Sequence, residues 1–383
     1  MILSQICNIY DGTHQTPKYV DEGVPFYSVE HVSKDDFSNT KFITEEVFTK
    51  ECQRVSIEQG DILMTRIGSV GVPKFIDWNV RASFYVSLAL LKPKTEGINM
   101  GWLSYYIQSP NIQRDIWRLT IHVAFPKKIN LGDIGKIRIK LPPKAEQESN
   151  YVLLKSVDQK INLLTKKKEA LETYKKGLMQ KIFSQELRFK REDGSDYPEW
   201  QNAILEEVII EIKIKSEYNN QYPILTSSRR GLFFQSDYYS KQVASEDNTG
   251  YNVVPRGYFT YRHMSDDLVF KFNINNICDF GLVSTLYPVF KVIPDKVSAE
   301  FLLLKLNEGE EFKRYCLMLK QGGSRTYMYL NKLKKLNLVL PSIQEQRHII
   351  KVTNAIDKKI ECNNQSLHSI EKLKKGLRQQ MFA

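Results

Sequence analysis

The chain lacks the residue patterns that mark secreted, membrane and metal-binding proteins. Its five cysteines are odd in number and never stand two residues apart, so reduced thiols are expected and not a disulfide framework. Its six histidines form no His-Glu-x-x-His pair, and no metal site is predicted. No apolar run approaches the roughly 18 residues of a membrane span, and the start does not resemble a signal peptide. We expect a cytoplasmic protein without metal or membrane contact.

Sequence motifs for catalysis are also missing. The chain has no Gly-x4-Gly-Lys-Ser/Thr loop for a nucleotide. It has neither a glycine-rich cofactor loop nor the Asn/Asp-Pro-Pro-aromatic motif with which amine methyltransferases orient a flipped base. No acidic pair recurs in both halves. We therefore assign no catalytic residue and expect a binding protein that is not itself an enzyme.

What the sequence does contain is a long internal repeat. Leu-Pro-Pro-Lys-Ala-Glu-Gln-Glu at 141–148 returns as Leu-Pro-Ser-Ile-Gln-Glu-Gln-Arg at 340–347. Lys-Lys-Gly-Leu-Met-Gln-Lys-Ile-Phe at 175–183 returns as Lys-Lys-Gly-Leu-Arg-Gln-Gln-Met-Phe at 374–382. A shift of 199 positions, which takes Leu141 to Leu340, aligns both motifs without a gap. The repeat predicts two long helices of equal length, each closing one half of the chain.

These helices, predicted at 141–183 and 341–383, carry apolar residues at the spacing of a coiled-coil seam. The seam positions are Val157, Ile161, Leu164, Leu171 and Leu178 in the first helix, and Ile356, Ile360, Leu367, Ile370 and Leu377 in the second. Neither helix has the broad apolar face needed to pack only on its own domain, so we predict that they pair with each other. The order domain, helix, domain, helix makes the pair antiparallel and pseudo-twofold symmetric. About 38 residues would give a spacer of roughly 57 Å.

The segments before the helices predict an α+β protein with two similar mixed α/β domains, at 1–140 and 201–340, and an ordered connector at 184–200. Their apolar frames match, as where Trp102-Leu103 corresponds to Phe301-Leu302, but their polar residues differ. In the first domain we expect strands at 24–29, 60–66, 84–91 and 137–141 and short helices at 99–108 and 110–118.

The charge balance indicates a polyanionic partner. Lysine and arginine number 55 against 44 acidic residues, which gives a net charge of +11 and a pI near 9.1. A basic surface of this size is typical of proteins that bind nucleic acid, although basic proteins without such a partner are common.

The motifs together resemble the specificity (S) subunit of type I restriction-modification systems, over essentially the whole chain. The resemblance is carried by the paired Leu-Pro…Glu-Gln helix starts, the Lys-Lys-Gly-Leu-Met-Gln-Lys-Ile-Phe end, the joint from Leu187-Arg188-Phe189 to Tyr197-Pro198-Glu199-Trp200, and the Gly60 to Gly71 segment. Each motif alone is weak, but their order, repeated twice, is specific.

The resemblance implies two target recognition domains that read a bipartite site in double-stranded DNA, one short half each. It implies paired helices that dock two modification (methyltransferase) subunits. Those subunits would hold S-adenosylmethionine and methylate adenine, and restriction (endonuclease/translocase) subunits would cleave DNA with ATP and Mg. This chain itself would bind none of these cofactors.

Two departures from the family pattern stand out. The first half begins without a lead like Tyr197-Pro198-Glu199-Trp200, so we expect either a missing piece of its first strand or a genuinely short start. In the second half Arg262 to Asp267 replaces the Gly-Ser-Val-Gly loop, so its DNA-facing loop cannot be inferred from the first.

DNA contacts are expected from loop side chains that reach base edges or phosphates. The candidates are His14, Thr16, Lys18, Arg66, Ser69, Lys74, Arg81, Lys127 and Lys128 in the first domain, and Arg229, Arg230, Arg256, Arg262, Ser324, Arg325 and Thr326 in the second. The last three follow the Gly322-Gly323 turn, which favours close approach of backbone to a phosphate. For any one of them, an ordinary solvated charge is an equally good interpretation.

Two other functional hypotheses remain open at this point. The chain could be a non-catalytic coiled-coil scaffold whose domains bind RNA or protein partners, and absence of salt-sensitive DNA affinity would favour this. It could also be an enzyme in its own right, which the missing motifs disfavour.

Overall fold

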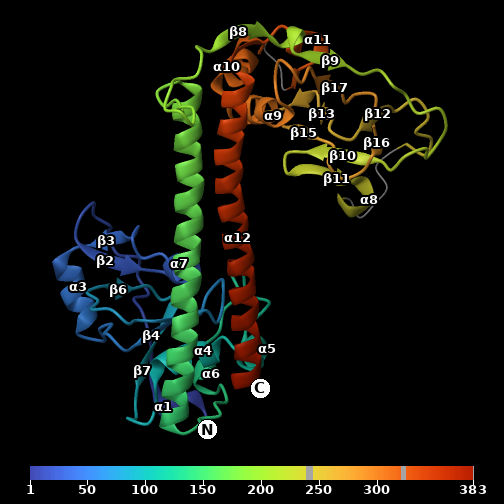
Figure 1. Ribbon diagram of the computed structural model, residues 1–383. Coiled ribbons are helices and arrows are strands. Elements are labelled where there is room, and N and C mark those ends of the chain that lie inside the picture. The colour runs from blue at the N-terminus through green and yellow to red at the C-terminus, as the bar shows by residue number, and fades with distance from the viewer. Residues whose placement is uncertain (239–244, 321–324, 383) are drawn as a thin grey trace. The chain divides into compact units, whose positions relative to one another are not determined.

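The structure is a computed structural model that describes residues 1–238, 245–320 and 325–382. The chain divides into two compact units, Met1–Lys166 with Asn364–Ala383 and Lys167–Asn363. Two long helices, α7 (Lys144–Phe183) and α12 (Ile343–Met381), each begin in one unit and end in the other (Figure 1). With 40 and 39 residues they have the equal length that the repeat predicts.

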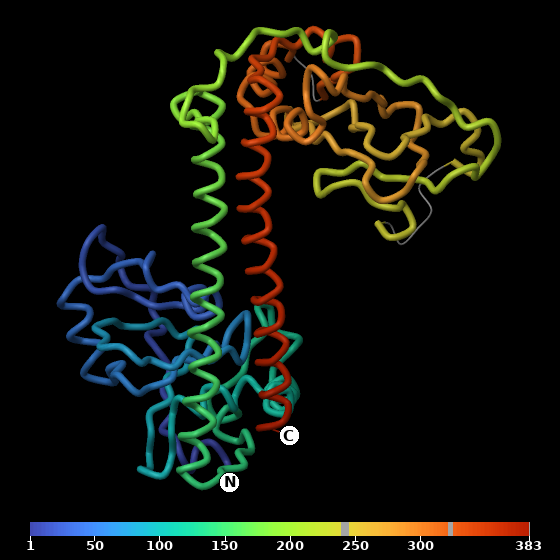
Figure 2. The backbone as a smooth tube through the Cα atoms, in the orientation of Figure 1, coloured from blue at the N-terminus to red at the C-terminus, as the bar shows by residue number. Residues whose placement is uncertain are grey.

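Unit 1 is a mixed α/β domain with the start of α7 and the end of α12. Its other elements are α1 (Leu3–Ile6), β1 (Cys7–Asp11), β2 (Val24–Tyr27), α2 (Val29–Lys34), β3 (Lys41–Ile43), α3 (Glu45–Cys52), β4 (Ile62–Thr65), β5 (Pro73–Phe75), β6 (Ser83–Phe84), β7 (Leu88–Pro93), α4 (Met100–Ile107), α5 (Pro110–Leu119) and α6 (Leu131–Gly135). Figure 2 follows the same backbone as a tube, with the C-terminal end of α12 beside α5.

Unit 2 is a second mixed domain with the end of α7 and the start of α12. Its other elements are β8 (Gln201–Ile204), the 3-10 helix η1 (Leu205–Glu207), β9 (Ile209–Glu211), β10 (Leu225–Ser228), β11 (Gly231–Phe234), α8 (Gln235–Tyr238), β12 (Asn252–Pro255), β13 (Phe259–Tyr261), β14 (Met264–Ser265), β15 (Phe272–Ile274), β16 (Phe280–Val283), β17 (Val289–Val292), α9 (Ala299–Glu308), α10 (Glu310–Met318), β18 (Thr326–Tyr327), α11 (Leu330–Leu333) and β19 (Asn337–Leu340).

The two domains share one sheet topology. The four-stranded antiparallel sheet has the order β1-β7-β4-β5 in unit 1 and β9-β17-β13-β15 in unit 2, so equivalent strands occupy equivalent places. The central strands β4 and β13 are buried along their whole length, and their sequences, Ile-Leu-Met-Thr and Phe-Thr-Tyr, contain no charged residue. The prediction of two similar mixed α/β domains is confirmed.

In unit 2 the end of α7 packs against the start of α12. Lys175 Nζ lies 2.5 Å from Asp357 Oδ1, and one turn further along α7 the Met179 Sδ lies 3.9 Å from Thr353 Oγ1. As the residue number rises on α7 it falls on α12, so the two helices are antiparallel there.

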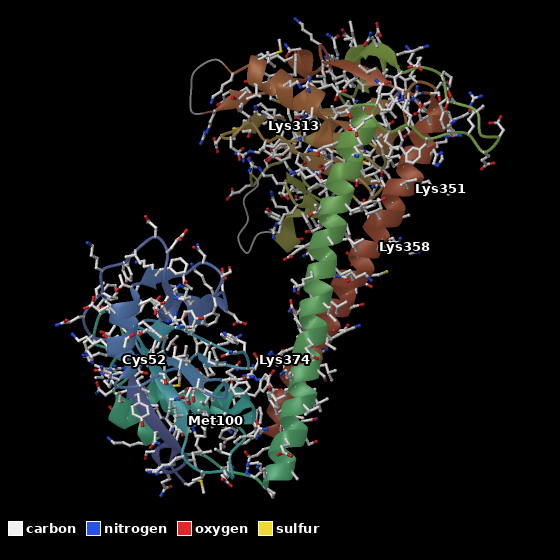
Figure 3. The ribbon with its side chains drawn as sticks, turned by 90° about the vertical axis from the view of Figure 1, so that its left-hand side faces the viewer. Cys52, Met100, Lys313, Lys351, Lys358 and Lys374 are labelled. Atoms are coloured by element: carbon white, nitrogen blue, oxygen red, sulfur yellow. The ribbon has the colours of Figure 1, made fainter. Side chains whose placement is uncertain are left out.

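Unit 1 contains the repeat copy of the same cross-helix pair. Lys374 Nζ of α12 lies 2.5 Å from Asp158 Oδ1 of α7, and the shift of 199 takes Asp158 to Asp357 and Lys175 to Lys374. Figure 3 labels Lys374 on α12. Lys175 and Lys374, which stand at equivalent seam positions of the two helices, are therefore each paired with an acidic residue of the other helix, as a polar seam residue that sets register should be.

The predicted seam residues all lie on shielded faces of the helices. Val157, Leu164 and Ile356 are buried, and Ile161, Leu171, Leu178, Ile360, Leu367, Ile370 and Leu377 are half-buried.

The start of α7 is fixed to the first domain by one buried glutamine. Gln147 accepts a hydrogen bond of 2.9 Å from the amide of Asn99, which is the N-cap of α4. Its Nε2 donates to the carbonyl oxygens of Pro142 at 2.8 Å and Gly97 at 3.1 Å. The repeated Glu-Gln motif is thus a joint between helix and domain.

The C-terminal end of each long helix packs an aromatic side chain into the hydrophobic core of the unit in which that end lies. Phe382, just past α12, packs edge-on to Trp102 of α4 with ring centroids 6.2 Å apart. Phe183, at the end of α7, packs in the same way on Phe301 of α9 at 6.3 Å. Each core therefore includes the last turn of the long helix that belongs to the other half of the sequence.

The connector 184–200 is ordered and packs on the start of α12, within unit 2. The Arg188 guanidinium donates to Glu345 at 3.1 Å and to Glu199 at 3.0 Å. Phe189 stacks on His348 with ring centroids 4.5 Å apart, and Trp200 is buried.

Two predicted strands of the first domain are wrong. The apolar run 84–91 is not one strand, because it breaks at Tyr85–Ser87, where Leu88 N donates to Tyr85 O in a turn between β6 and β7. The segment 137–141, which the structure describes throughout, forms only an isolated bridge between Arg138 and Ile2. Its counterpart in unit 2 is a strand, β19, because β8 supplies four paired residues there.

Candidate nucleic-acid interface

In unit 1 three loops meet around Arg66. This residue follows β4 and is buried, with its Nε donating to Ile129 O at 3.3 Å and its Nη1 to Val86 O at 3.2 Å. The carboxylate of Asp11 lies 3.7 Å away. Burial lowers the pKa of the Arg66 guanidinium, and the Asp11 charge opposes that shift. Arg66 is therefore bonded to the loops on either side of it, and its guanidinium is largely shielded from the surface, unlike the other predicted DNA contacts of this domain.

The loop after β1 carries three exposed candidates, His14, Thr16 and Lys18. Its base lies tightly on β6, since a Cβ at Gly12 would lie 2.1 Å from the Phe84 carbonyl oxygen. His14 Nε2 lies 2.7 Å from Asp11 Oδ2, and Thr16 Oγ1 lies 3.3 Å from the Tyr85 hydroxyl. These side chains form one polar edge of the domain.

A second pair of loops brings Ser69 close to Lys127 and Lys128, and all three are exposed. Gly68 N donates to Lys127 O at 2.8 Å, and Ile67 and Lys128 form an antiparallel bridge. Sequence separation had concealed that these candidates share one surface.

Lys74 and Arg81 are engaged with acidic residues. Lys74 forms an ion pair with Asp35, and Arg81 holds Glu45 through both guanidinium nitrogens while its plane covers Phe48 at 4.7 Å. A phosphate would have to displace these carboxylates.

In unit 2 three predicted cations surround one cavity of about 600 Å³. Arg229 and Arg230 form the tip of the β10–β11 hairpin, and Arg262 follows β13. The wall behind them includes Ser227, whose Oγ accepts from Asn273 Nδ2 at 2.8 Å. The cavity is thus a cationic hollow built on a rigid sheet.

The other residues of unit 2 that were predicted to contact DNA are either paired with acidic residues, part of a strand, or outside the described residues. Arg256 is held by Asp279 at 2.9 Å and does not line this cavity. Arg325 pairs with Asp266 at 3.1 Å, and Thr326 lies in β18. Ser324 and the Gly322-Gly323 turn fall outside the described residues.

One acidic residue organises the rim of the cavity. The Asp267 carboxylate accepts hydrogen bonds from both terminal guanidinium nitrogens of Arg229. It also accepts a hydrogen bond of 2.9 Å from Ser265 Oγ. The hydrogen bonds from Arg229 hold the pKa of the Asp267 carboxyl well below its usual range. Among the described residues no ion pair is formed by Arg262, which is exposed at the same rim.

Sequence reasoning missed an aromatic cluster beside this hollow. His263 is buried and stacks on Tyr329 with ring centroids 5.1 Å apart, and Tyr327 lies 5.9 Å from Tyr329 in near-parallel orientation. Burial lowers the pKa of the His263 imidazole, which favours its neutral form. The two tyrosines are partly exposed, so they offer flat surfaces of the kind on which bases stack. The sequence gives no sign of this cluster, because Tyr327 and Tyr329 lie more than 60 positions after His263 and the three residues form no periodic pattern.

The described residues include neither a membrane span nor a metal site. No helix there is long and apolar enough to cross a bilayer, and no group of His, Cys, Asp and Glu side chains there is arranged to hold a metal ion.

Comparison with known proteins gives a consistent result. The family model for the type I restriction modification DNA specificity domain matches twice, at residues 1–173 and 178–372. A putative type I restriction enzyme MjaX specificity subunit of Methanocaldococcus jannaschii is 24% identical over 93% of this chain and 85% of its own length. The type I restriction enzyme MjaVIII specificity subunit of the same organism is 25% identical over 63% of this chain and 60% of its own length.

Solved structures agree at the level of the fold. The S subunit of a type I restriction-modification system from M. genitalium superposes with a TM-score of 0.59 at 14% identity, covering 100% of this chain and 95% of that one. A chain from a structure on complex assembly and conformational transition of the type I R-M system gives 0.57, also at 14% identity, covering 100% and 96%. Because the family model covers nearly the whole sequence in two consecutive copies, the chain belongs to the type I restriction modification DNA specificity family.

Proposed function

We propose that the chain is the non-catalytic DNA-recognition subunit of a type I restriction-modification complex and reads a bipartite site, one half with each domain. The observation that carries the proposal is the double family match on a chain whose two domains share a sheet topology but differ in loop chemistry. The first domain offers His14, Lys127 and Lys128 on loops, and the second offers an arginine-rimmed hollow. Two readers with one fold and different surfaces suit two different half-sites.

The long helices are the proposed docking surface for two modification subunits. The helix α7 exposes apolar side chains at intervals along its length, with Val152 65% exposed, Leu163 65% and Tyr174 59%. On α12 Leu373 is 50% exposed. Apolar residues on the outer face of a helix pair are unfavourable in water and favour a protein partner.

Cofactor chemistry is assigned to the partner subunits in this proposal. The modification subunits would hold S-adenosylmethionine and methylate adenine. Restriction subunits would use ATP and Mg to cleave unmodified DNA. The scaffold alternative, in which the domains bind RNA or unrelated proteins, has no support from the family match.

The test is to map methylated adenines in the host genome with and without the gene for this chain. We expect loss of methylation at one discontinuous sequence, in which two short specific blocks are separated by unread bases. Unchanged methylation, or loss at a continuous site, would contradict the proposal. Methyl transfer by the purified chain alone would contradict its non-catalytic role.

A further inference from the structure

We propose that the loop 121–128 of the first domain, here called the wedge loop, inserts Val123 and Phe125 into a base step of duplex DNA. Lys127 and Lys128 would hold the flanking phosphates. The inference rests on the proposed function and adds a mode of recognition, local unstacking, to it.

The tip of the wedge loop exposes large apolar groups that nothing in its unit covers. Phe125 is fully exposed at 102% and Val123 at 96%, and the neighbouring Trp117 of α5 is 64% exposed. Side chains of this size are normally buried, and exposing several together marks an interaction site. The wedge loop is therefore shaped for a partner that offers an apolar slot.

The base of the wedge loop is firmly held. Ile121 N donates to Lys128 O at 2.7 Å, and Gly68 N donates to Lys127 O at 2.8 Å. Ile129 N then donates to the Arg66 carbonyl at 2.9 Å, so the segment that follows the loop is fixed to the centre of the site. A rigid base with a projecting tip can push into a stack without losing its own structure.

The chemistry around the tip selects a polyanion as the occupant. Lys127 and Lys128 are exposed, and among the described residues neither forms an ion pair. On α5 Arg114 lies three residues before Trp117 and four before Arg118, so both are its neighbours on the helix surface, and all three side chains are exposed. Trp117 in turn contacts His122 of the wedge loop with ring centroids 4.6 Å apart.

Apolar side chains flanked by cations match a known way of deforming DNA. Proteins insert Phe, Leu, Ile, Met or Pro between base pairs, unstack the step and kink the duplex, while Lys and Arg bind the phosphates on either side. Of the cations around the tip only Arg118 has an acidic partner among the described residues, Asp115 at 3.4 Å on its own helix. An exposed surface for a folded protein partner would not need this density of lysine and arginine around so small an apolar tip.

The corresponding segment of the second domain has a different sequence. A shift of 199 places Gly322 opposite Val123 and Ser324 opposite Phe125. The backbone pairing next to these positions is alike in the two domains. The antiparallel bridge between Ile67 and Lys128 in unit 1 corresponds to the antiparallel pair of Met264 in β14 and Tyr327 in β18. The second domain's sequence thus has no large apolar residue at these two positions, and the distortion should fall in the half-site which the first domain reads.

The test uses the chain assembled with its modification subunits and duplexes with 2-aminopurine placed at successive steps of the target. We expect a fluorescence rise of several-fold at one step of the first domain's half-site. The double variant V123S/F125S should abolish that rise and weaken specific binding about tenfold, without changing the salt dependence, because no phosphate contact is lost. A flipped adenine gives its own signal, which this variant should not alter.

Two control variants separate the parts of the proposal. K127A/K128A should keep the rise at saturating protein but lower the slope of log affinity against log salt by about 2, near 0.9 for each phosphate contact. I210S removes an apolar side chain of β9 that is 44% exposed and should change nothing.

Several outcomes would overturn the wedge. It fails if V123S/F125S behaves as wild type, or if the rise persists in that variant. It fails equally if the variant loses modification subunits while the assembled complex keeps its DNA affinity, because the loop would then be a protein contact. Failure of the wild-type complex to bind any discontinuous sequence would instead contradict the proposed function.

Discussion

Gln346 Oε1 accepts a hydrogen bond of 2.8 Å from the backbone amide of Ser298, the N-cap residue of α9. Its Nε2 donates to the carbonyl oxygens of Pro341 at 2.9 Å and Lys296 at 3.4 Å. Gln147 makes the same three bonds in unit 1, so one repeated glutamine joins each long helix to its domain.

Replacing Gln147 by leucine should destabilise unit 1. The side chain is 0% exposed, and the change leaves the Asn99 amide and two carbonyls buried without partners. The expected cost is about 2 to 3 kcal/mol. Hydrogen exchange should accelerate in the first turn of α4, and the unfolding midpoint in urea should fall. Gln159, exposed on the same helix, supplies the control Gln159→Ala, which should shift neither. Equal effects of both changes would contradict the joint.

The cross-helix pair of Lys175 and Asp357 should show favourable coupling. Both side chains are partly exposed, at 26% and 47%, so the coupling should be only about 0.5 to 1 kcal/mol and should weaken in salt. A double-mutant cycle with Lys175→Ala and Asp357→Ala, followed by urea unfolding, measures it. Charge exchange, with Lys175→Asp and Asp357→Lys together, should restore most of what either reversal loses. Zero coupling at low salt would count against the antiparallel register in unit 2.

Substitutions of the buried Lys305 and of its partner Glu311 should have different effects on the stability of the protein. Its Nζ lies 2.5 Å from Glu311 Oε1, 4.8 Å from the Phe183 ring and 5.1 Å from the Trp200 ring. Glu311→Gln leaves a buried cation unpaired and should cost about 3 kcal/mol, whereas Lys305→Met should be neutral or stabilising at pH 7.

The pH dependence follows from the direction of the shift. Burial lowers the pKa of the Lys305 ammonium, and Glu311 partly opposes this. The unfolded chain therefore binds the proton more tightly, and wild-type stability should rise as the pH climbs through the folded pKa toward the unfolded value near 10.4. The stability of Lys305→Met relative to wild type should shrink over the same range. Urea midpoints of both proteins between pH 7 and pH 10 test this, and a constant difference would contradict it.

Arg66 should matter for DNA binding without touching phosphate. Arg66→Met removes the bonds to Val86 and Ile129 that fix two loops, so specific affinity should fall about tenfold or more. The slope of log affinity against log salt should stay as in wild type, because no surface cation is lost. Fluorescence anisotropy at several salt concentrations, with Lys18→Ala as a surface-cation control, separates the two roles. A slope reduced by about 1 for Arg66→Met would mean that the side chain does reach a phosphate.

The long helices and the duplicated domains could be predicted because the sequence itself carries their signals: the coiled-coil spacing of apolar residues and the repeat at a shift of 199 positions. The observed helix bounds, Lys144–Phe183 and Ile343–Met381, differ from the predicted ones, 141–183 and 341–383, by two or three residues at each start and by two at the end of the second helix. Pro142 and Pro341 each stand two residues before the observed start of their helix, where proline is common in proteins. The break of the 84–91 run was not predictable, because an apolar run gives no sign of the turn at Tyr85–Ser87.

The state of each candidate cation depends on partners that are distant in sequence. Arg229 pairs with Asp267, and Arg81 with Glu45, across 38 and 36 positions. Arg66 is buried because its carbonyl partners belong to loops elsewhere in the fold. The sequence likewise did not predict that Phe125 is exposed, because the segment around it, Ile-His-Val-Ala-Phe at 121–125, resembles an ordinary apolar segment.

The most direct test of two independent readers on one chain is to exchange residues 201–340 for the equivalent domain of another family member. Adenine methylation is then mapped by sequencing in cells that carry the hybrid. The account predicts that one specific block of the target changes while the other block keeps its sequence. A target in which both blocks change, or in which neither does, would contradict it.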